Sequence, residues 1–310
     1  MNLFRDHDHH GLCGSSVVAI GNFDGVHRGH QALLSSARRL QQPGDALALV
    51  SFEPLPKAFF TPEQAPARLM GPAQKLRFLR GQGVDLAWLL RFNKALASME
   101  PEAFIERILV RGLRARGVVV GGDFRFGRAR QGDLALLRDL GEAFGYETIE
   151  VPAVCERGER ISSSALRKAL AEGHFKRAEA YLGRPYSVEG RVVRGAQLGR
   201  RLGYPTANIR PWRGSTPLHG VFAVRARLPG KAWLDGVASV GVRPAVGGGE
   251  PLIEVHLFDF SGDLYGCRLE VRFLSRLRGE EDFPEIDALV RQMKQDEARA
   301  RTLLARAPGE

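Results

Sequence analysis

Cysteine is scarce in this chain, and long hydrophobic runs are missing from it. The three cysteines, Cys13, Cys155 and Cys267, lie far apart and are odd in number, which fits neither a disulfide framework nor a CxxC metal knuckle. No apolar run approaches the ~20 residues that span a bilayer, and residues 1–16 contain no apolar core of a secretion signal. We therefore predict a cytoplasmic protein that is not integral to a membrane.

Acidic residues are in the minority. The chain has 45 Lys+Arg against 35 Asp+Glu, and its formal net charge of +10 favours anionic partners such as nucleotides, phosphates or nucleic acid. The arginines are scattered, and no aromatic RNA-binding signature accompanies them. A GxxxxGK[ST] loop is also missing, which disfavours a Walker-type kinase. Charge alone leaves a nucleotide enzyme and a nucleic-acid-binding protein both open.

The first part of the chain alternates strand-like and helical patterns. At roughly 150 residues per domain, 310 residues suggest two domains. Strands are predicted at residues 17–20, 46–52, 85–91 and 117–122, and helices at residues 30–40, 74–80 and 101–111. This alternation predicts a doubly wound parallel sheet. A further helical pattern covers residues 161–182, with Ser162 to Ser164 as candidate N-caps.

The pattern changes after Gly183-Arg184-Pro185. Short β-branched or aromatic runs follow at residues 187–193, 221–228, 237–242, 252–258 and 267–273, and a helix is predicted at residues 283–304. Such spacing predicts an antiparallel barrel or sandwich. We expect an α/β domain over residues 1–184 and an antiparallel β-barrel domain with a C-terminal helix over residues 185–310.

A glycine-rich segment, GNFDGVHRGH, covers residues 21–30 between the first strand and the first helix. His27 and His30 are three residues apart, so both imidazoles lie on one face of a helix that begins there. A helix N-terminus attracts anions, and two imidazoles can hold triphosphate oxygens while charge moves onto a leaving pyrophosphate. Gly21 and Gly29 let the backbone approach a nucleotide closely. Histidine pairs also serve as simple helix caps, so both interpretations stay open at this point.

Three segments, taken in order, resemble the bacterial bifunctional riboflavin kinase/FMN adenylyltransferase (FAD synthetase) family. GNFDGVHRGH resembles the HxGH signature of its cytidylyltransferase-like nucleotidyltransferase domain. GGDFRFG, at residues 121–127, resembles the flavin-contacting loop, and ISSSALR, at residues 161–167, resembles the ISSTxxR segment. Where the family frequently has Pro-His-Pro, this chain has Pro54-Leu55-Pro56, so we assign no catalytic role to Leu55.

The resemblance implies roles for residues in these segments. It implies catalytic roles for His27, His30 and Arg167, and nucleotide contacts for Gly21, Phe23, Asp24, Gly29, Ser163 and Ser164. It implies flavin contacts for Asp123, Phe124 and Phe126. Serine hydroxyls and a guanidinium can donate to triphosphate oxygens, and aromatic faces suit a flavin ring. The alternatives are a capped surface helix for ISSSALR and ordinary core packing for the phenylalanines.

A second glycine- and arginine-rich segment, residues 190–209, ends in Pro205-Thr206-Ala207-Asn208. In an extended segment Thr206 and Asn208 point the same way and offer two oxygens to Mg²⁺, a hard cation. Gly199 and Arg200 suit a loop that folds over phosphates. Without further evidence, an arginine-rich glycine loop is more often a solvated turn.

This segment closely resembles the GRxLGxPTAN motif of riboflavin kinases, and residues 253–266 match the later strands of that family. The resemblance implies that Glu254 is the catalytic base for the ribityl 5′-hydroxyl and that Asp296 and Arg301 lie over the flavin. It also implies nucleotide contacts for Gly199 and Arg200 and metal contacts for Thr206 and Asn208. The alternatives are a surface glutamate on a strand and a solvated face of the last helix.

Over about residues 15–305 the resemblance implies a bifunctional enzyme of FAD biosynthesis. ATP and Mg²⁺ would phosphorylate riboflavin to FMN in the C-terminal domain, and a second ATP would adenylylate FMN to FAD in the N-terminal domain, with release of pyrophosphate. We expect small-molecule substrates, no nucleic-acid or membrane partner, and a monomer or weak homo-oligomer. The alternatives are a nucleic-acid-binding protein and a transferase in which one half has decayed. His7, His9 and His10 are interpreted as adventitious rather than as a metal site.

Overall fold

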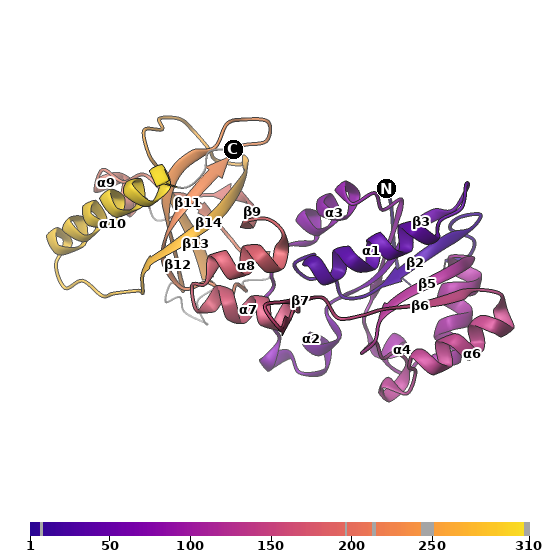
Figure 1. Ribbon diagram of the computed structural model, residues 1–310. Coiled ribbons are helices and arrows are strands. Elements are labelled where there is room, and N and C mark those ends of the chain that lie inside the picture. Colours follow the sequence, from indigo (N-terminus) through magenta and orange to yellow (C-terminus); the bar gives the residue numbers. More distant parts are fainter. Residues whose placement is uncertain (7–8, 196, 213–214, 243–250, 307–310) are drawn as a thin grey trace. The chain divides into compact units, whose positions relative to one another are not determined.

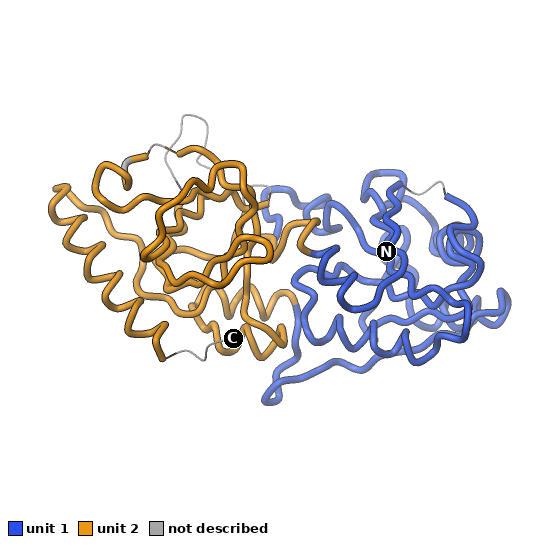
Figure 2. Tube along the Cα trace, turned by 90° about the horizontal axis from the view of Figure 1, so that it is seen from above, with its two compact units in different colours: residues 1–66, 75–162 blue, residues 67–74, 163–310 orange. Residues whose placement is uncertain are grey.

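The computed structural model describes residues 1–6, 9–195, 197–212, 215–242 and 251–306, and the chain divides into two compact units. The first unit comprises residues 1–66 and 75–162, and the second comprises residues 67–74 and 163–310 (Figure 2). The division falls before the predicted boundary near residue 184, because the helices that follow residue 162 cluster with the barrel. The predicted role of His7 concerns a position outside the described residues.

The first unit is built on a six-stranded parallel sheet with the strand order β1-β4-β3-β2-β5-β6. Its strands are β1 (Asn2–Arg5), β2 (Ser16–Ile20), β3 (Ala46–Glu53), β4 (Leu86–Arg91), β5 (Ala115–Gly121) and β6 (Glu147–Val151). The four central strands match the four predicted from apolar runs. The two edge strands, β1 and β6, were not predicted, because most of their residues are exposed or half-buried and form no apolar run.

Helices cover both faces of this sheet, which confirms the doubly wound α/β prediction (Figure 1). They are α1 (Arg28–Leu40), α2 (Pro56–Phe60), α3 (Pro72–Gly81), α4 (Lys94–Ala97), α5 (Pro101–Phe104) and α6 (Leu134–Phe144), with short 3-10 turns at Pro62–Gln64 and Arg128–Arg130. The predicted helix 101–111 becomes α-helical only over α5 and continues as a π-helix, η2 (Ile105–Gly112). A two-stranded hairpin, β7 (Cys155–Glu156) and β8 (Glu159–Arg160), closes the unit.

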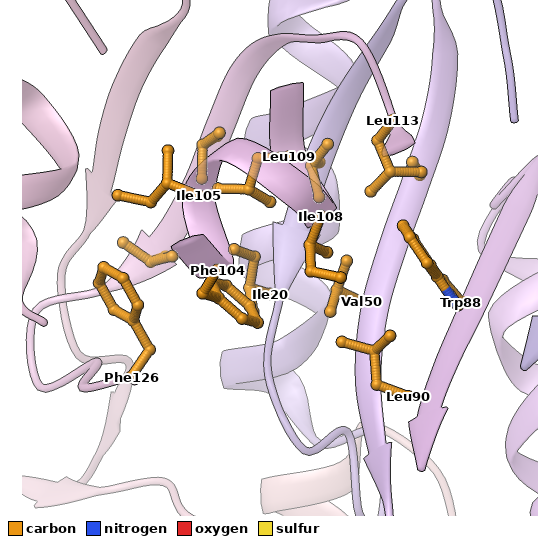
Figure 3. Packing of buried hydrophobic residues seen from close by; sticks show 14 of the residues in the cluster. Ile20, Val50, Trp88, Leu90, Phe104, Ile105, Ile108, Leu109, Leu113 and Phe126 are labelled. Atoms are coloured by element: carbon orange, nitrogen blue, oxygen red, sulfur yellow. The ribbon is translucent and has the colours of Figure 1, made fainter. Parts of the chain in front are cut away.

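The main core of this unit lies between η2 and one face of the sheet (Figure 3). Ile105 and Ile108 of η2 pack with Ile20 and Val50, which stand on the central strands. Trp88 of β4 is fully buried at the edge of this cluster. A β-carbon on Gly112 would lie 2.5 Å from the Trp88 ring, so only glycine lets η2 end there. This packing fixes the strands whose carboxyl ends carry the first motif.

The second unit is a closed six-stranded antiparallel barrel with the strand order β10-β13-β12-β11-β14-β9, and the barrel prediction is therefore confirmed over the sandwich alternative. Its strands are β9 (Tyr186–Val193), β10 (Ala207–Ile209), β11 (Gly220–Arg227), β12 (Leu234–Val242), β13 (Pro251–Leu257) and β14 (Arg268–Arg278). Its helices are α7 (Ser163–Ala171), α8 (Phe175–Leu182), α9 (Leu198–Arg201) and α10 (Ile286–Arg306).

The helical pattern over residues 161–182 forms two helices, α7 and α8, instead of one. Gly173 lies between them with φ +78°, a left-handed conformation that ends a helix. The predicted C-terminal helix is confirmed as α10, which packs on the barrel through Ala300 and Leu304. Within the described part of the chain, every helix is too short or too polar to cross a membrane.

Candidate active sites

The first motif forms a sharp loop at the carboxyl end of β2. His27 is the N-cap of α1, and its Nδ1 accepts a hydrogen bond from the backbone N–H of His30 at 3.4 Å. The two imidazole rings stack with their centroids 3.7 Å apart, and the His30 ring lies 4.8 Å from the Phe23 ring. Because Nδ1 of His27 is an acceptor, the proton of its neutral ring lies on Nε2.

The backbone of this loop is strained. Phe23 and Val26 have φ values of +49° and +43°, which β-carbon-bearing residues rarely adopt outside functional sites. Asp24, between them, is buried. Gly21 lies against the Phe23 ring, and a β-carbon on Gly29 would lie 3.1 Å from the His27 ring. The predicted nucleotide-contacting residues of this segment are therefore packed together at one point of the first unit.

His30 is buried and neutral. Burial lowers its pKa well below the ordinary value, and the nearby charges of His27 and Lys75 lower it further. Its Nδ1 is buried and has no hydrogen-bond partner within the described residues. A buried polar atom without a partner at a helix N-terminus is positioned to form a hydrogen bond with a bound ligand.

Lys75 lies beside this loop and was not among the residues predicted from the sequence. Lys75, on α3, is almost fully buried, and its Nζ lies 3.3 Å from the Asn22 carbonyl oxygen and 3.2 Å from Ser51 Oγ. A lysine in a helix with other basic residues looks like part of a solvated face. Only the helical spacing of its apolar neighbours, together with the position of the helix against the sheet, could have identified it as buried.

We predict that His30 makes stability depend on pH. The pKa of His30 is lower in the folded state than in the unfolded chain, where it is about 6.5. Below that pH the unfolded chain binds a proton that the folded protein does not, so the free energy of unfolding decreases as pH falls. Urea denaturation from pH 7.5 to pH 5 should show a steeper loss of stability for the wild type than for His30→Gln. Parallel curves for the two proteins would contradict a buried neutral His30.

The predicted flavin loop follows β5. Phe126 is a core residue, and its ring centroid lies 5.4 Å from those of both Phe104 and Phe124. Its surroundings are those expected for a residue packed in the core. Phe124 is half-buried and stacks on Phe126 at an interplanar angle of 15°. Asp123 is exposed and forms a 2.7 Å ion pair with Arg160 of β8. The structure thus leaves Phe124 and Asp123 as the more accessible members of the predicted set.

The ISSSALR segment passes from one unit to the other. Ile161 belongs to the first unit, and its carbonyl oxygen would lie 3.6 Å from a β-carbon placed on Gly29. Ser163 and Ser164 begin α7 in the second unit, where Arg167 Nε donates to the Ala67 carbonyl oxygen at 2.6 Å. Their predicted contacts with the nucleotide stay predictions.

The second motif brings two predicted residues, Asn208 and Glu254, to one face of the barrel. Asn208 of β10 pairs directly with Glu254 of β13, and directly opposed residues of an antiparallel pair project to the same face. Thr206 directly precedes β10 and lines the same pocket as Asn208. Glu254 also pairs with Ser239 of β12. Asn208 and Glu254 are far apart in the sequence, and the register between β10 and β13 places them opposite each other.

A pocket of about 340 Å³ opens beside this face. Arg200, Thr206 and Asn208 line one side of it, and the loop formed by residues 260–265 lines the other. Glu254 is not among its lining residues, so its proximity rests on the strand register alone. Tyr265 of the loop accepts a hydrogen bond from Gln197 Nε2 at 3.1 Å and lies under the Arg194 guanidinium, 5.6 Å from the ring centroid.

The donors in this pocket fit a magnesium ion bound together with a nucleotide. Asn208 Oδ1 is buried and makes no hydrogen bond within the described residues, and a β-carbon on Gly195 would lie 2.6 Å from the Asn208 amide. Among the described residues, no group of three or more His, Cys, Asp or Glu could form an all-protein metal cage. Magnesium is commonly held by one or two protein oxygens, with phosphates and water completing its shell, and Thr206 and Asn208 match that mode.

Asp296 and Arg301, both on α10, form ion pairs with residues outside that helix. Asp296 is buried and accepts from Arg278 Nε at 3.1 and 3.0 Å and from Gln292 at 3.0 Å, which anchors α10 to β14. Arg301 pairs with Asp259 at 2.8 and 3.1 Å on the surface. Their predicted flavin contacts stay predictions, and the structure gives Asp296 a structural role of its own.

Two family models match the chain, one in each half. The FAD synthetase model matches residues 12–165, and the riboflavin kinase model matches residues 182–304. The chain is 43% identical to the bifunctional riboflavin kinase/FMN adenylyltransferase of Escherichia coli K12, over 92% of this chain and 91% of that protein. It is 47% identical to the protein of the same name from Pseudomonas fluorescens, over 93% of each chain.

A solved structure shares the fold of this chain. It is described as a macrolide-efflux protein from Streptococcus pneumoniae and matches with a TM-score of 0.82 and 32% identity. The match covers 97% of this chain and 99% of the other, so both the parallel sheet and the barrel are included.

Proposed function

The chain belongs to the bifunctional riboflavin kinase/FMN adenylyltransferase family, and from this premise we propose which of its residues carry each reaction. Riboflavin is phosphorylated to FMN in the barrel, and FMN is adenylylated to FAD in the α/β part. The observation that carries the proposal is the match of a separate family model to each half, with one candidate site in each. The proposed functional division lies at residue 184, near the start of the riboflavin kinase match.

We propose that Glu254 is the base of the kinase reaction. It takes the proton of the ribityl 5′-hydroxyl as that oxygen attacks the γ-phosphorus of ATP and ADP leaves. Thr206 and Asn208 would hold Mg²⁺, which supplies charge neutralisation at the phosphates when it is bound. Gly199 and Arg200 would contact the nucleotide, Arg200 through its guanidinium. The pairing of Asn208 with Glu254 supports this assignment.

We propose that His27 and His30 stabilise the adenylyl-transfer transition state. The FMN phosphate oxygen attacks the α-phosphorus of ATP, and the bond to pyrophosphate breaks as negative charge moves onto it. The α1 N-terminus and the two imidazoles would receive that charge. No side-chain nucleophile is required, because FMN supplies the attacking oxygen.

The remaining predicted contacts complete the proposal. Around the nucleotide of the α/β part we place Gly21, Phe23, Asp24, Gly29, Ser163, Ser164 and Arg167. Around the flavins we place Asp123, Phe124, Phe126, Asp296 and Arg301. We also propose a cytoplasmic enzyme, monomeric or weakly oligomeric, with no nucleic-acid partner.

Gly199→Ala should impair the kinase selectively. A β-carbon at residue 199 would lie 2.3 Å from the Tyr204 carbonyl oxygen, while the Tyr204 N–H donates to the Gly199 carbonyl oxygen at 2.7 Å. The turn that carries Arg200 must therefore open. Because misplacement by about 1 Å can cost about 10²-fold in rate, we expect a loss of that order in kcat/KM for riboflavin phosphorylation. Unchanged FMN formation would show that this turn does not position the nucleotide.

The two activities can be tested separately. Riboflavin with Mg·ATP should yield FMN, and FMN with Mg·ATP should yield FAD and pyrophosphate. Conversion of one substrate only would support a protein in which one half has decayed. Salt-sensitive oligonucleotide binding with no turnover of either substrate would favour the nucleic-acid alternative.

A further inference from the structure

Lys75 is a buried lysine next to the first candidate site, and no step of the proposed mechanism uses it. Its side chain is 3% exposed, although an ammonium group removed from water is costly unless it is well coordinated. The Asn22 carbonyl oxygen and Ser51 Oγ lie within hydrogen-bond distance of Nζ. Lys75 comes from α3, Ser51 from β3, and Asn22 from the loop after β2.

Hydrogen bonds link these three residues around one carbonyl group. Ser51 Oγ donates to the Asn22 carbonyl oxygen at 3.0 Å, and Lys75 Nζ donates both to that oxygen and to Ser51 Oγ. Asn22 immediately precedes Phe23, whose left-handed backbone persists only if its surroundings hold it. The Phe23 ring in turn contacts His30.

We propose that Lys75 is a positioning residue of the adenylyl-transfer site, fixing the Asn22 carbonyl against β3 so that the Phe23, His30 and His27 rings are held ready for the nucleotide. This inference rests on the proposed adenylyltransferase function. Lys75 would act in two ways: its hydrogen bonds hold the loop at Asn22, and its positive charge acts on His30.

The charge of Lys75 also acts on His30. The two ionisable groups that shift the His30 pKa are His27, from the start of the same helix, and Lys75, from α3. Both add to burial in lowering that pKa. Removal of the Lys75 charge should therefore raise the His30 pKa toward its ordinary value, whereas a change confined to packing would leave this electrostatic contribution in place.

Lys75→Met tests the proposal, because methionine keeps much of the side-chain length and removes the charge and the donor. Lys94→Met is the matched control, since Lys94 is exposed in the same unit. We expect kcat for FAD formation from FMN to fall about 10²-fold in Lys75→Met, as for a misplaced catalytic group. Riboflavin phosphorylation should be unchanged, and ¹⁵N-histidine NMR should show the His30 titration moved to higher pH. Lys94→Met should match the wild type in all three measurements.

Ser51→Ala keeps the proposal testable if Lys75→Met does not fold. This variant removes one donor to the Asn22 carbonyl and retains the ammonium group, so FAD formation should fall by a smaller factor and the His30 titration should stay in place. Wild-type FAD formation and His30 titration in Lys75→Met, or wild-type FAD formation in Ser51→Ala, would overturn the role of Lys75. Absence of FAD formation in the wild type would instead overturn the proposed function.

Discussion

Glu254→Gln is expected to suppress FMN formation from riboflavin while FAD formation from supplied FMN continues. Glutamine has nearly the shape of glutamate but cannot accept the proton of the ribityl 5′-hydroxyl. General-base catalysis contributes about 10²–10⁴-fold to a rate, and the loss in kcat should fall in that range. The measurement is the initial rate of each reaction at saturating Mg·ATP.

The register of the barrel supports Glu254 as the base. Glu254 faces Asn208 across a strand pair, next to a pocket lined by Thr206 and Asn208. Glu285, which is exposed before α10, serves as the control, and Glu285→Gln should leave both reactions intact. Unchanged FMN production by Glu254→Gln would remove Glu254 as the base.

His30→Ala is expected to have the opposite selectivity, abolishing FAD formation and sparing FMN formation. The variant removes an imidazole that stacks on His27 and leaves a gap beside Phe23, so both charge stabilisation and the geometry of the loop are lost. Loss of a preorganised transition-state donor costs about 10²–10³ in kcat, or roughly 3–4 kcal/mol. Steady-state rates with FMN and with riboflavin measure the two effects.

An exposed histidine of the same unit controls for nonspecific effects. His10→Ala should match the wild type in both reactions, because His10 is exposed. If a folded His30→Ala protein lost both activities together, the proposed division of labour between the two halves would be wrong.

The central strands could be predicted because apolar runs depend on local sequence, and the period-2 arrangement of Thr206 and Asn208 is a prediction of the same local kind. Apolar runs report burial on both faces of a parallel sheet, and side chains two residues apart in an extended chain point the same way. The edge strand β6 carries exposed residues and gave no such run. The pairing of Asn208 with Glu254 depends on register between distant strands, which no local pattern encodes.

Residue type alone also could not show which of the predicted contact residues are buried. Phe126 and Asp296 are predicted flavin contacts, and the structure adds that Phe126 is buried against Phe104 and that Asp296 is buried in an ion pair with Arg278. Lys75 shows the reverse case, because a basic residue in a basic helix proved to be buried beside the candidate site. Burial arises from tertiary packing, so these assignments required the fold.

A time course with riboflavin, ATP and Mg²⁺ tests the central claim most directly. Chromatography of samples from one reaction resolves riboflavin, FMN and FAD. We predict that FMN appears first and that FAD follows as FMN is consumed. A protein that converts neither riboflavin nor separately supplied FMN would contradict the assignment of both sites.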